Sequence, residues 1–356
     1  MNRLMNILRP MALALLTTMG TTAAQALEAD SLPSQSQGEK PQVGRPAWMP
    51  HVSGTIRGKW EWQTEQGESR FEVRTARLAV DGRITPIVEY KAEIDLSDEG
   101  QIKMLDAYAG ILPMEGIGLR IGQMRVPFSI DAHRSPHKQY FANRSFIAKQ
   151  VGNVRDVGVY AGYTSATLPL IVEAGAFNGS GLTNQKNFWT KELNFSAKVQ
   201  VPLTCGLTLE GSVQKVSPNG TAVYLYDAGA TFQHGRFTLE AEYLRKHYTH
   251  DAFTAVNAVD AFVCYDQPLK HVFRKVSLLC RYDMMDNHSD GTLDEDGRFK
   301  LTDAKRHRVT PGITLSLAQK MDADIRVNYE KYFYDDKSLA KPSEHDKAVV
   351  ELVVHF

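Results

Sequence analysis

Apolar and polar residues alternate strictly along many segments of this 356-residue chain, as in 192–201 (ELNFSAKVQV) and 324–330 (DIRVNYE). Neighbouring side chains of a β-strand point to opposite faces, so a strand with this pattern has one apolar and one polar face. Many of the runs reach about ten residues, the length that a tilted strand needs to cross a bilayer, whereas strands of soluble sandwiches usually have about five or six. The pattern predicts an all-β fold, namely a transmembrane antiparallel β-barrel.

Composition removes several other classes of protein. The mean hydropathy is −0.32, and no run of 18 apolar residues is present, which excludes a helical membrane protein. Because 41 basic residues balance 41 acidic ones, no overall charge favours nucleic acid as a partner. Cys205, Cys264 and Cys280 lie far apart without a CxxC spacing. We therefore predict no disulfide framework, no metal site and no cofactor.

The amino terminus has the features of a targeting segment. Arg3 and Arg9 are basic, residues 11–19 form a short apolar stretch, and Ala24-Gln25-Ala26 has the small residues of a cleavage site. We predict a cleaved signal peptide at residues 1–26, because an uncleaved anchor helix would be too short to span a bilayer. Residues 27–50, rich in Ser, Gln, Pro and Gly, are then a flexible lead-in, and residues 51–356 form the barrel.

Long and short connections alternate between the runs, as in bacterial barrels that have long loops outside and tight turns inside. This spacing predicts about sixteen strands, near residues 51–63, 69–82, 86–97, 102–112, 116–126, 154–164, 168–177, 191–202, 206–216, 222–233, 236–247, 256–266, 272–284, 306–318, 322–334 and 347–356. The even number places both ends of the barrel at the periplasmic rim. In the second strand the apolar parity changes, which predicts a β-bulge near Thr75.

The carboxyl terminus supports this assignment independently. Residues 350–356 (VELVVHF) alternate and end on Phe356, which resembles the terminal signature read by the barrel-assembly machinery. Aromatic residues such as Trp60 and Trp62 gather at strand ends, where rings would lie at the membrane interface, although core packing would also place them there. We therefore expect a barrel in the outer membrane of a Gram-negative bacterium, in contact with lipid and lipopolysaccharide, that admits small solutes.

Four segments resemble the phosphate-selective porin O/P family: 122–129 (GQMRVPFS), 74–82 (RTARLAVDG), 155–159 (RDVGV) and 326–332 (RVNYEKY). The resemblance extends over most of the expected mature chain. It implies a trimeric, sixteen-stranded, anion-selective porin whose third extracellular loop folds inward to constrict the pore. The solutes implied are small anions, with phosphate or polyphosphate as candidates.

The connection at 127–155 carries many basic residues and only one carboxylate, Asp131. An anion that loses its hydration in a narrow pore needs Arg, Lys and N–H groups to replace the lost water. By position in the loop, Lys138 matches the family's constriction lysine, and the candidate constriction also contains Arg134, Arg144 and Arg125. The alternative is that these basic residues are solvated or contact the phosphates of lipopolysaccharide.

The predicted lumen wall carries charges of both signs. Strand parity directs toward the lumen the basic residues Arg57, Lys59, Arg77, Arg120 and Arg326. The same parity directs inward the acidic residues Glu61, Glu89, Glu93, Asp95, Glu210, Glu240, Glu242, Asp324, Glu330 and Glu351. A mixed wall favours general polar solutes as readily as anions, so a general or weakly selective porin is the alternative function.

Two further classes of outer-membrane barrel remain as alternatives to a porin. We predict no enzyme, because neither a GxSxG nor an HExxH motif is present, although His247, His250 and Asp251 could contribute to an omptin-like site. A surface adhesin with a plugged barrel is the third class. The acidic residues of 283–296 do not have EF-hand spacing, so we expect a solvated loop there, with a divalent cation bridge to lipopolysaccharide as the alternative.

Overall fold

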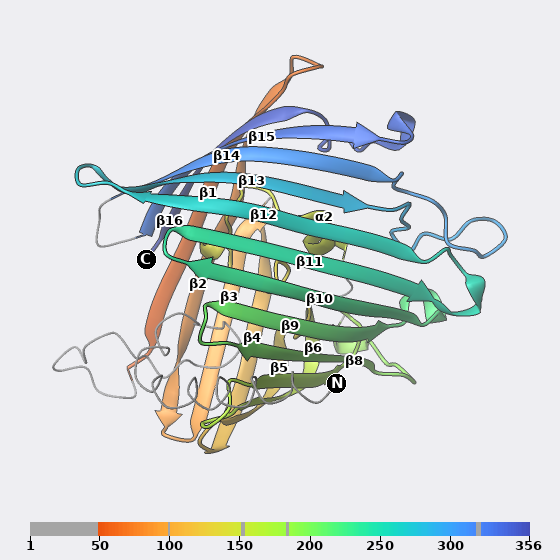
Figure 1. Cartoon of the computed structure of the whole chain (residues 1–356). Helices are drawn as coiled ribbons and strands as arrows, with labels where there is room; N and C mark the ends of the chain where they lie inside the picture. Colours follow the sequence, from red (N-terminus) through yellow and green to blue (C-terminus); the bar gives the residue numbers. More distant parts are fainter. Residues whose placement is uncertain (1–48, 99, 151–153, 183–184, 318–321) are drawn as a thin grey trace, which may run out of the picture.

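Sixteen antiparallel strands close into one barrel in the computed structural model of the protein (Figure 1). Each strand pairs with its neighbours along the chain, and β1 closes the ring by pairing with β16. The structure describes residues 49–356 except 99, 151–153, 183–184 and 318–321. The predicted signal peptide therefore lies outside the described residues, as does nearly all of the predicted lead-in. The predicted fold class and strand number are confirmed, and each strand boundary lies within three residues of its predicted place.

The strands are β1 (His51–Gln63), β2 (Ser69–Thr85), β3 (Val88–Asp98), β4 (Gln101–Met114), β5 (Ile117–Arg125), β6 (Arg155–Thr164), β7 (Ile171–Phe177), β8 (Asn194–Pro202), β9 (Leu207–Val216), β10 (Val223–His234), β11 (Phe237–Tyr248), β12 (Val256–Pro268), β13 (Phe273–Met285), β14 (Arg306–Leu317), β15 (Asp322–Tyr334) and β16 (Lys347–His355). The helices are short: η1 (Pro136–Lys138), α2 (Phe146–Gln150), η2 (Gln185–Asn187), η3 (Pro218–Gly220), η4 (Thr249–Asp251) and η5 (Lys337–Leu339). None of these described helices is long and apolar enough to span a membrane.

Strand β11 shows how the alternation of residues determines the two faces of the wall. From Leu239 to Tyr248 the residues alternate: the odd-numbered ones are exposed on the outside, and the even-numbered ones are buried inside the barrel. The outward set includes Leu239 and Tyr243, whereas Glu240 and Glu242 point inward. An apolar outer surface and a polar inner surface are what a strand between lipid and lumen requires.

Both ends of the barrel lie at one rim, which we call the terminal rim. Thr55 pairs with His355, and Gly54 and Phe356 exchange two backbone hydrogen bonds of 2.8 and 3.0 Å. The long connections gather at the opposite end, which we call the loop rim. This agrees with the predicted alternation of loops and turns.

The ring of Phe356 occupies the space that a side chain at Gly54 would need, because a Cβ built there would collide with the ring. We expect that deleting Phe356, or replacing Gly54→Val, will lower the fraction of barrel that refolds to a trypsin-resistant, heat-modifiable form. Gly58→Val is the matched control, since a Cβ at that site on the same strand meets no atom within 4 Å. Equal refolding of Gly54→Val and Gly58→Val would show that the ring is not needed for closure.

The predicted bulge is present in β2. The pairing with β1 moves from Arg57 opposite Thr75 to Gly58 opposite Val73, so Arg74 is the extra residue. An extra residue shifts the side-chain parity by one. Both apolar parities of β2 therefore point outward, and Phe71 and Leu78 are 86% and 40% exposed.

Candidate pore constriction

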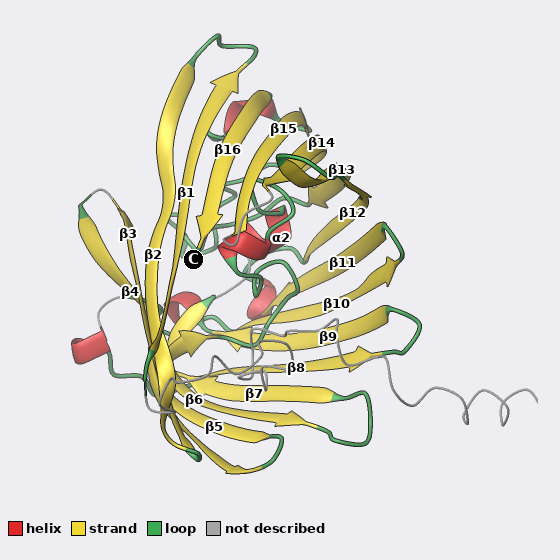
Figure 2. Cartoon of the chain, turned by 90° about the vertical axis from the view of Figure 1, so that its left-hand side faces the viewer, coloured by secondary structure: helices red, strands yellow, loops and turns green. Residues whose placement is uncertain are grey.

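The connection between β5 and β6 enters the barrel instead of covering its mouth. We call residues 126–150 the inner loop. Figure 2 shows α2, which belongs to this loop, inside the ring of strands. The loop forms hydrogen bonds with inward side chains of β1, β9, β11, β13, β14 and β15. The inward fold that the family resemblance implies is confirmed.

The first limb of the inner loop is held by one carboxylate of the wall. Glu242 on β11 accepts hydrogen bonds from the Ser129 hydroxyl at 2.5 Å and from the backbone N–H groups of Ile130 and Asp131 at 2.7 and 3.3 Å. Ser129 has a φ of +67°, a left-handed conformation that costs a residue with a side chain roughly 1–3 kcal/mol. The three hydrogen bonds to Glu242 offset this cost and fix the turn by which the chain enters the lumen.

Asp131 joins the two limbs of the inner loop. Its carboxylate accepts hydrogen bonds from the backbone N–H and the hydroxyl of Ser145, each at 2.9 Å, and from Arg134 at 3.3 Å. Arg144 in turn donates to the backbone carbonyls of Asp131 and Arg134. Burial alone would raise the pKa of the Asp131 carboxyl, but the guanidinium groups of Arg144 and Arg134 lower it to about 2. The carboxylate is therefore ionised at neutral pH and acts as an internal cross-link.

The tip of the inner loop descends to the terminal rim. Arg326 donates to the carbonyl of His137 at 3.0 Å, and the rings of His137 and His355 stack with centroids 3.7 Å apart. Arg57 donates to the Gln139 side chain at 2.7 Å and to the Ala142 carbonyl at 2.6 Å. The loop thus extends along the lumen from one end of the barrel to the other.

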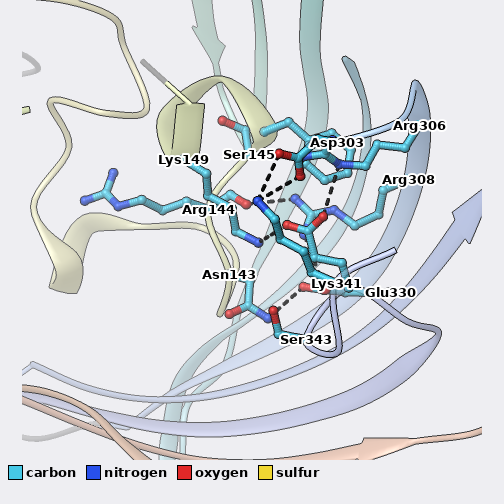
Figure 3. Close-up of polar contacts among 12 residues, drawn as sticks. Asn143, Arg144, Ser145, Lys149, Asp303, Arg306, Arg308, Glu330, Lys341 and Ser343 are labelled. Atoms are coloured by element: carbon cyan, nitrogen blue, oxygen red, sulfur yellow. Dashed lines mark hydrogen bonds and ion pairs between the residues drawn. The ribbon is translucent and has the colours of Figure 1, made fainter. Parts of the chain in front are cut away.

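The second limb returns to the loop rim through α2. The backbone N–H of Phe146 donates to Asp283 on β13 at 3.0 Å, and Arg308 on β14 donates to the same carboxylate at 2.6 Å. Arg308 also donates to the Arg144 carbonyl at 2.8 Å (Figure 3). Phe146 and Ile147 are fully buried in an apolar cluster inside the barrel. The other buried members of this cluster are Phe128, Val223, Leu225, Leu244, Tyr248, Val256, Ala258, Met285, Phe299 and Tyr332.

The four residues predicted for the constriction lie in the inner loop or at its base, in different environments. Lys138 is exposed at the tip. Arg134 is paired with Glu240 at 2.6 Å. Burial alone would lower the pKa of Arg134, but the carboxylates of Glu240 and Asp131 raise it. Arg125, at the end of β5, donates to the His133 carbonyl and to Ser135.

His133, a further residue of this loop, is neutral at neutral pH, because burial lowers its pKa well below the ordinary value. It therefore adds no charge to the constriction.

The predicted lumen residues divide into two groups. Arg57, Lys59 and Arg326 are at most 6% exposed, because the inner loop covers them. Arg77 and Arg120 are more accessible, with side chains 17% and 9% exposed. The residues of both groups form ion pairs with wall carboxylates: Arg57 and Arg326 with Glu351, Lys59 with Glu61, Arg77 with Asp95, and Arg120 with Glu89.

The wall against which the basic loop packs is acidic. On β9 to β12 the buried inward carboxylates are Glu210, Asp227, Glu240, Glu242 and Asp260. Coulomb attraction between this wall and the loop's arginines is strong where water is excluded. Strand parity predicted inward positions for three of these carboxylates, but their use as attachment points for the loop was not predicted.

The acidic connection near residues 283–296 differs from the expected solvated loop at its first residue. Asp283 is fully buried and pairs with Arg308, because the inner loop and β14 cover it. Asp290 and Asp294 are exposed and accept hydrogen bonds from turn N–H groups. Among the described residues, no group of three or more His, Cys, Asp or Glu side chains could hold a metal ion.

Residues 59–217 match the sequence model of the family described as phosphate-selective porin O and P. No curated protein matches the sequence. The match extends from the end of β1 to β9 and includes the inner loop.

Solved structures with a similar fold are outer-membrane proteins. An anion-selective porin from Comamonas acidovorans is 14% identical, with a TM-score of 0.60 over 86% of this chain and 98% of that porin. OmpF of Salmonella typhi, solved with daunomycin, is 14% identical, with a TM-score of 0.61 over 87% of this chain and 98% of that one. The trimer form of OmpT from Vibrio cholerae is 11% identical, with a TM-score of 0.59 over 87% and 100%.

At these identities the structural likeness establishes the fold, and the family match adds the class of protein. Family and fold are those of a channel rather than of an enzyme. The chain is therefore a porin of the Gram-negative outer membrane, and its residues 59–217 match the phosphate-selective porin O and P family.

Proposed function

We propose that this porin lets small anions, phosphate among them, diffuse passively through the barrel, and that the inner loop is the constriction. The observation that carries the proposal is the position of this loop, which brings Arg134, Lys138 and Arg144 into the lumen. Because anions shed part of their hydration in a narrow pore, fixed donors there lower the barrier to their passage.

The proposal assigns different parts to the basic residues. Lys138, exposed at the tip, meets the passing anion, and Arg77 on β2 and Arg120 on β5 are partly accessible to it. Arg144 donates its hydrogen bonds to neutral carbonyls, and the nearby Asp131 carboxylate compensates part of its charge. Arg134 is tied to Glu240, so its main part is to hold the loop.

A general porin is the second candidate, and the pairing in the wall favours it. Arg77 and Arg120 are within 3.1 and 2.7 Å of Asp95 and Glu89, so their charges are partly compensated. A compensated wall discriminates less between anions and cations.

We propose the same partners that the sequence indicates. A homotrimer is supported by the trimer form of OmpT, which has a similar fold. Export through a signal peptide at residues 1–26, insertion by the barrel-assembly machinery through Phe356, and contact with lipopolysaccharide belong to this proposal.

The reversal potential of the purified protein in a planar bilayer under a salt gradient tests the proposal. We expect a reversal potential near the value for a membrane that is permeable to anions only. We also expect phosphate to block the chloride current. A potential near zero would support the general porin, and an absence of conductance would favour a plugged adhesin.

Replacing Lys138→Glu is expected to shift the reversal potential toward cations and to weaken block by phosphate. At about 1 M salt the Debye length is about 3 Å, so only a charge at the constriction still acts. Lys186→Glu is the control, because this lysine is exposed in the connection between β7 and β8, at the loop rim. Identical selectivity of wild type and Lys138→Glu at this salt concentration would show that Lys138 does not line the ion path.

A further inference from the structure

An apolar groove of about 1040 Å³ crosses the outer face of the barrel from β3 to β10. Its floor is one row of outward residues that are neighbours in the sheet register: Leu119, Ala161, Ala174, Ala197 and Val213. The alanines keep the floor low, whereas Val159 and Phe195 in the next row are 50% and 53% exposed and form a wall. Because the strands of a barrel are tilted, a row across them slopes through the membrane. The groove can therefore hold extended hydrocarbon chains against the barrel.

Basic residues surround the end of the groove that is nearest the loop rim. Tyr224 and Tyr226, near the start of β10, line this end and are 37% and 48% exposed. In the sheet register Tyr224 is paired with Lys215 of β9 and with His247 of β11, and Tyr226 is paired with Arg245 of β11. These three strands lie side by side (Figure 1). The side chains of Arg245 and His247 are exposed on the outer face, so positive charge gathers beside the groove.

Arg245 carries its charge on the outer face without a carboxylate of the same chain. Among the residues that the structure describes, it forms no ion pair. Asn257, its register partner on β12, is bonded to Asp286, whose carboxylate is also 4.0 Å from Lys305. An arginine on the lipid face is costly at the middle of the bilayer and is accommodated near the interface. The position of Arg245 therefore indicates an anionic group that is supplied by the membrane.

Charge and groove together define the class of the ligand. A free phosphate ion would bind the basic residues but leave the groove unused, and an uncharged lipid would leave Arg245 unpaired. A lipid with phosphate on its head group satisfies both, because a guanidinium binds phosphate through two N–H groups and tyrosine rings favour the membrane interface. Lys215 contributes less to the binding, since Glu192 already pairs with it at 2.9 Å.

We propose that one lipopolysaccharide molecule of the outer leaflet binds at this site. Its phosphate lies at Arg245, with Lys215 and His247 beside it, and its acyl chains lie in the groove below Tyr224 and Tyr226. The inference rests on the contact with lipopolysaccharide proposed above, to which it gives one defined place. It does not depend on ion selectivity, so the reversal potential of the pore and the binding of this lipid can fail separately.

Native mass spectrometry of the purified full chain, titrated with phosphorylated lipid A in detergent, tests the proposal. Wild type should retain a single lipid per barrel. Arg245→Gln should weaken binding about tenfold, and removal of the phosphates from lipid A should weaken binding to wild type by a similar factor. Lys331→Gln is the control, because Lys331 is also a cation near the loop rim, 45% exposed, but lies on β15 and is paired with Asp346. It should bind the lipid as wild type does.

A second pair of variants tests the groove itself. Ala174→Trp fills the floor and should weaken lipid binding, whereas Ala241→Trp, at an exposed outward position of β11 outside the groove, should not. Heat-modifiable migration verifies that each variant is folded, and the Arg245→Gln result stands by itself if Ala174→Trp does not fold.

Three results would overturn the proposal. Equal affinity of wild type and Arg245→Gln would show that Arg245 does not bind the phosphate. An equal loss in Lys331→Gln would show that basic residues attract the lipid only as a general belt of charge. The same spectra report the number of chains, so loss of a trimer in Ala174→Trp with lipid binding unchanged would assign the groove to a contact between copies.

Discussion

A barrel in which residues 130–149 are replaced by a short Gly-Ser linker should conduct several times more ion current than the intact protein. The inner loop occupies the lumen from the loop rim to the terminal rim, so its removal widens the narrowest part of the path. Strands β5 and β6 remain paired up to Arg125 opposite Arg155, so a short linker can join them. Single-channel recordings in about 1 M salt would measure the change, and circular dichroism would verify the barrel.

The connection at residues 178–193, at the loop rim, provides the control for this deletion. Shortening it by a similar linker should leave the conductance within a factor of about two, because it adds only access resistance at the mouth. If the barrel without the inner loop had an intact circular dichroism spectrum and an unchanged conductance, the ion path would not pass the loop. The basic residues of the loop could then not determine selectivity.

The strands could be predicted from the sequence because their signal is local. A period of two requires only that one face meets lipid and the other the lumen, and each residue of β11 reports its own face. The bulge at Arg74 was predictable for the same reason, since the apolar parity changes on either side of it. Turn residues then fixed the strand ends to within three positions.

The function of the inward charges could not be predicted in the same way. The alternation along the strands correctly predicted that Arg57 and Arg326 point into the lumen, but it does not indicate which residues cover them. Their partners in the loop are about 80 and 190 residues away in the sequence, so only the folded loop shows that they hold it. For the same reason, the role of Asp131 as the cross-link between Arg134 and Ser145 could not be read from the sequence.

The sequence carries one local signal of the place where the inner loop docks in the lumen. At the loop-rim end of β10, residues 223–226 (VYLY) are apolar on both faces. Apolar residues also point inward at the same end of β11 (Leu244, Tyr248) and of β12 (Val256, Ala258). A strand between lipid and a water-filled lumen is expected to carry polar side chains on its lumen face. Val223 and Leu225 point into the barrel and pack in the cluster that contains Phe146 and Ile147. Loss of alternation therefore marks the place where the loop docks.

Replacing Arg308→Met should destabilise the docked loop by about 3–5 kcal/mol, the largest effect that we expect from a single side chain. Arg308, Asp283 and Glu330 are each fully buried. The guanidinium is 2.6 Å from Asp283 and 3.3 Å from Glu330, and it lies over the Phe146 ring at 4.7 Å. Removing it leaves buried carboxylates without their main counter-charge, and such an uncompensated charge is costly.

Two measurements would separate loss of loop docking from loss of the whole barrel. Urea titration of the barrel in lipid vesicles reports the overall free energy of unfolding, and hydrogen exchange at the Phe146 amide, which donates to Asp283, reports docking of α2. In Arg308→Met the amide should lose protection by several orders of magnitude while the strands keep theirs. Arg274→Met, at an exposed position of β13, should change stability by less than about 0.5 kcal/mol.

The double variant Arg308→Met with Asp283→Leu shows whether the charge or the packing of Arg308 holds the loop. If uncompensated charge is the cause, removing Asp283 as well should restore much of the lost protection, because apolar replacements of a buried ion pair are often neutral or stabilising. The restoration should be incomplete, since Glu330 has still lost its partner Arg308 and the Phe146 N–H loses its acceptor. If the double variant were as unprotected as Arg308→Met, then contacts such as that with the Phe146 ring would hold the loop instead.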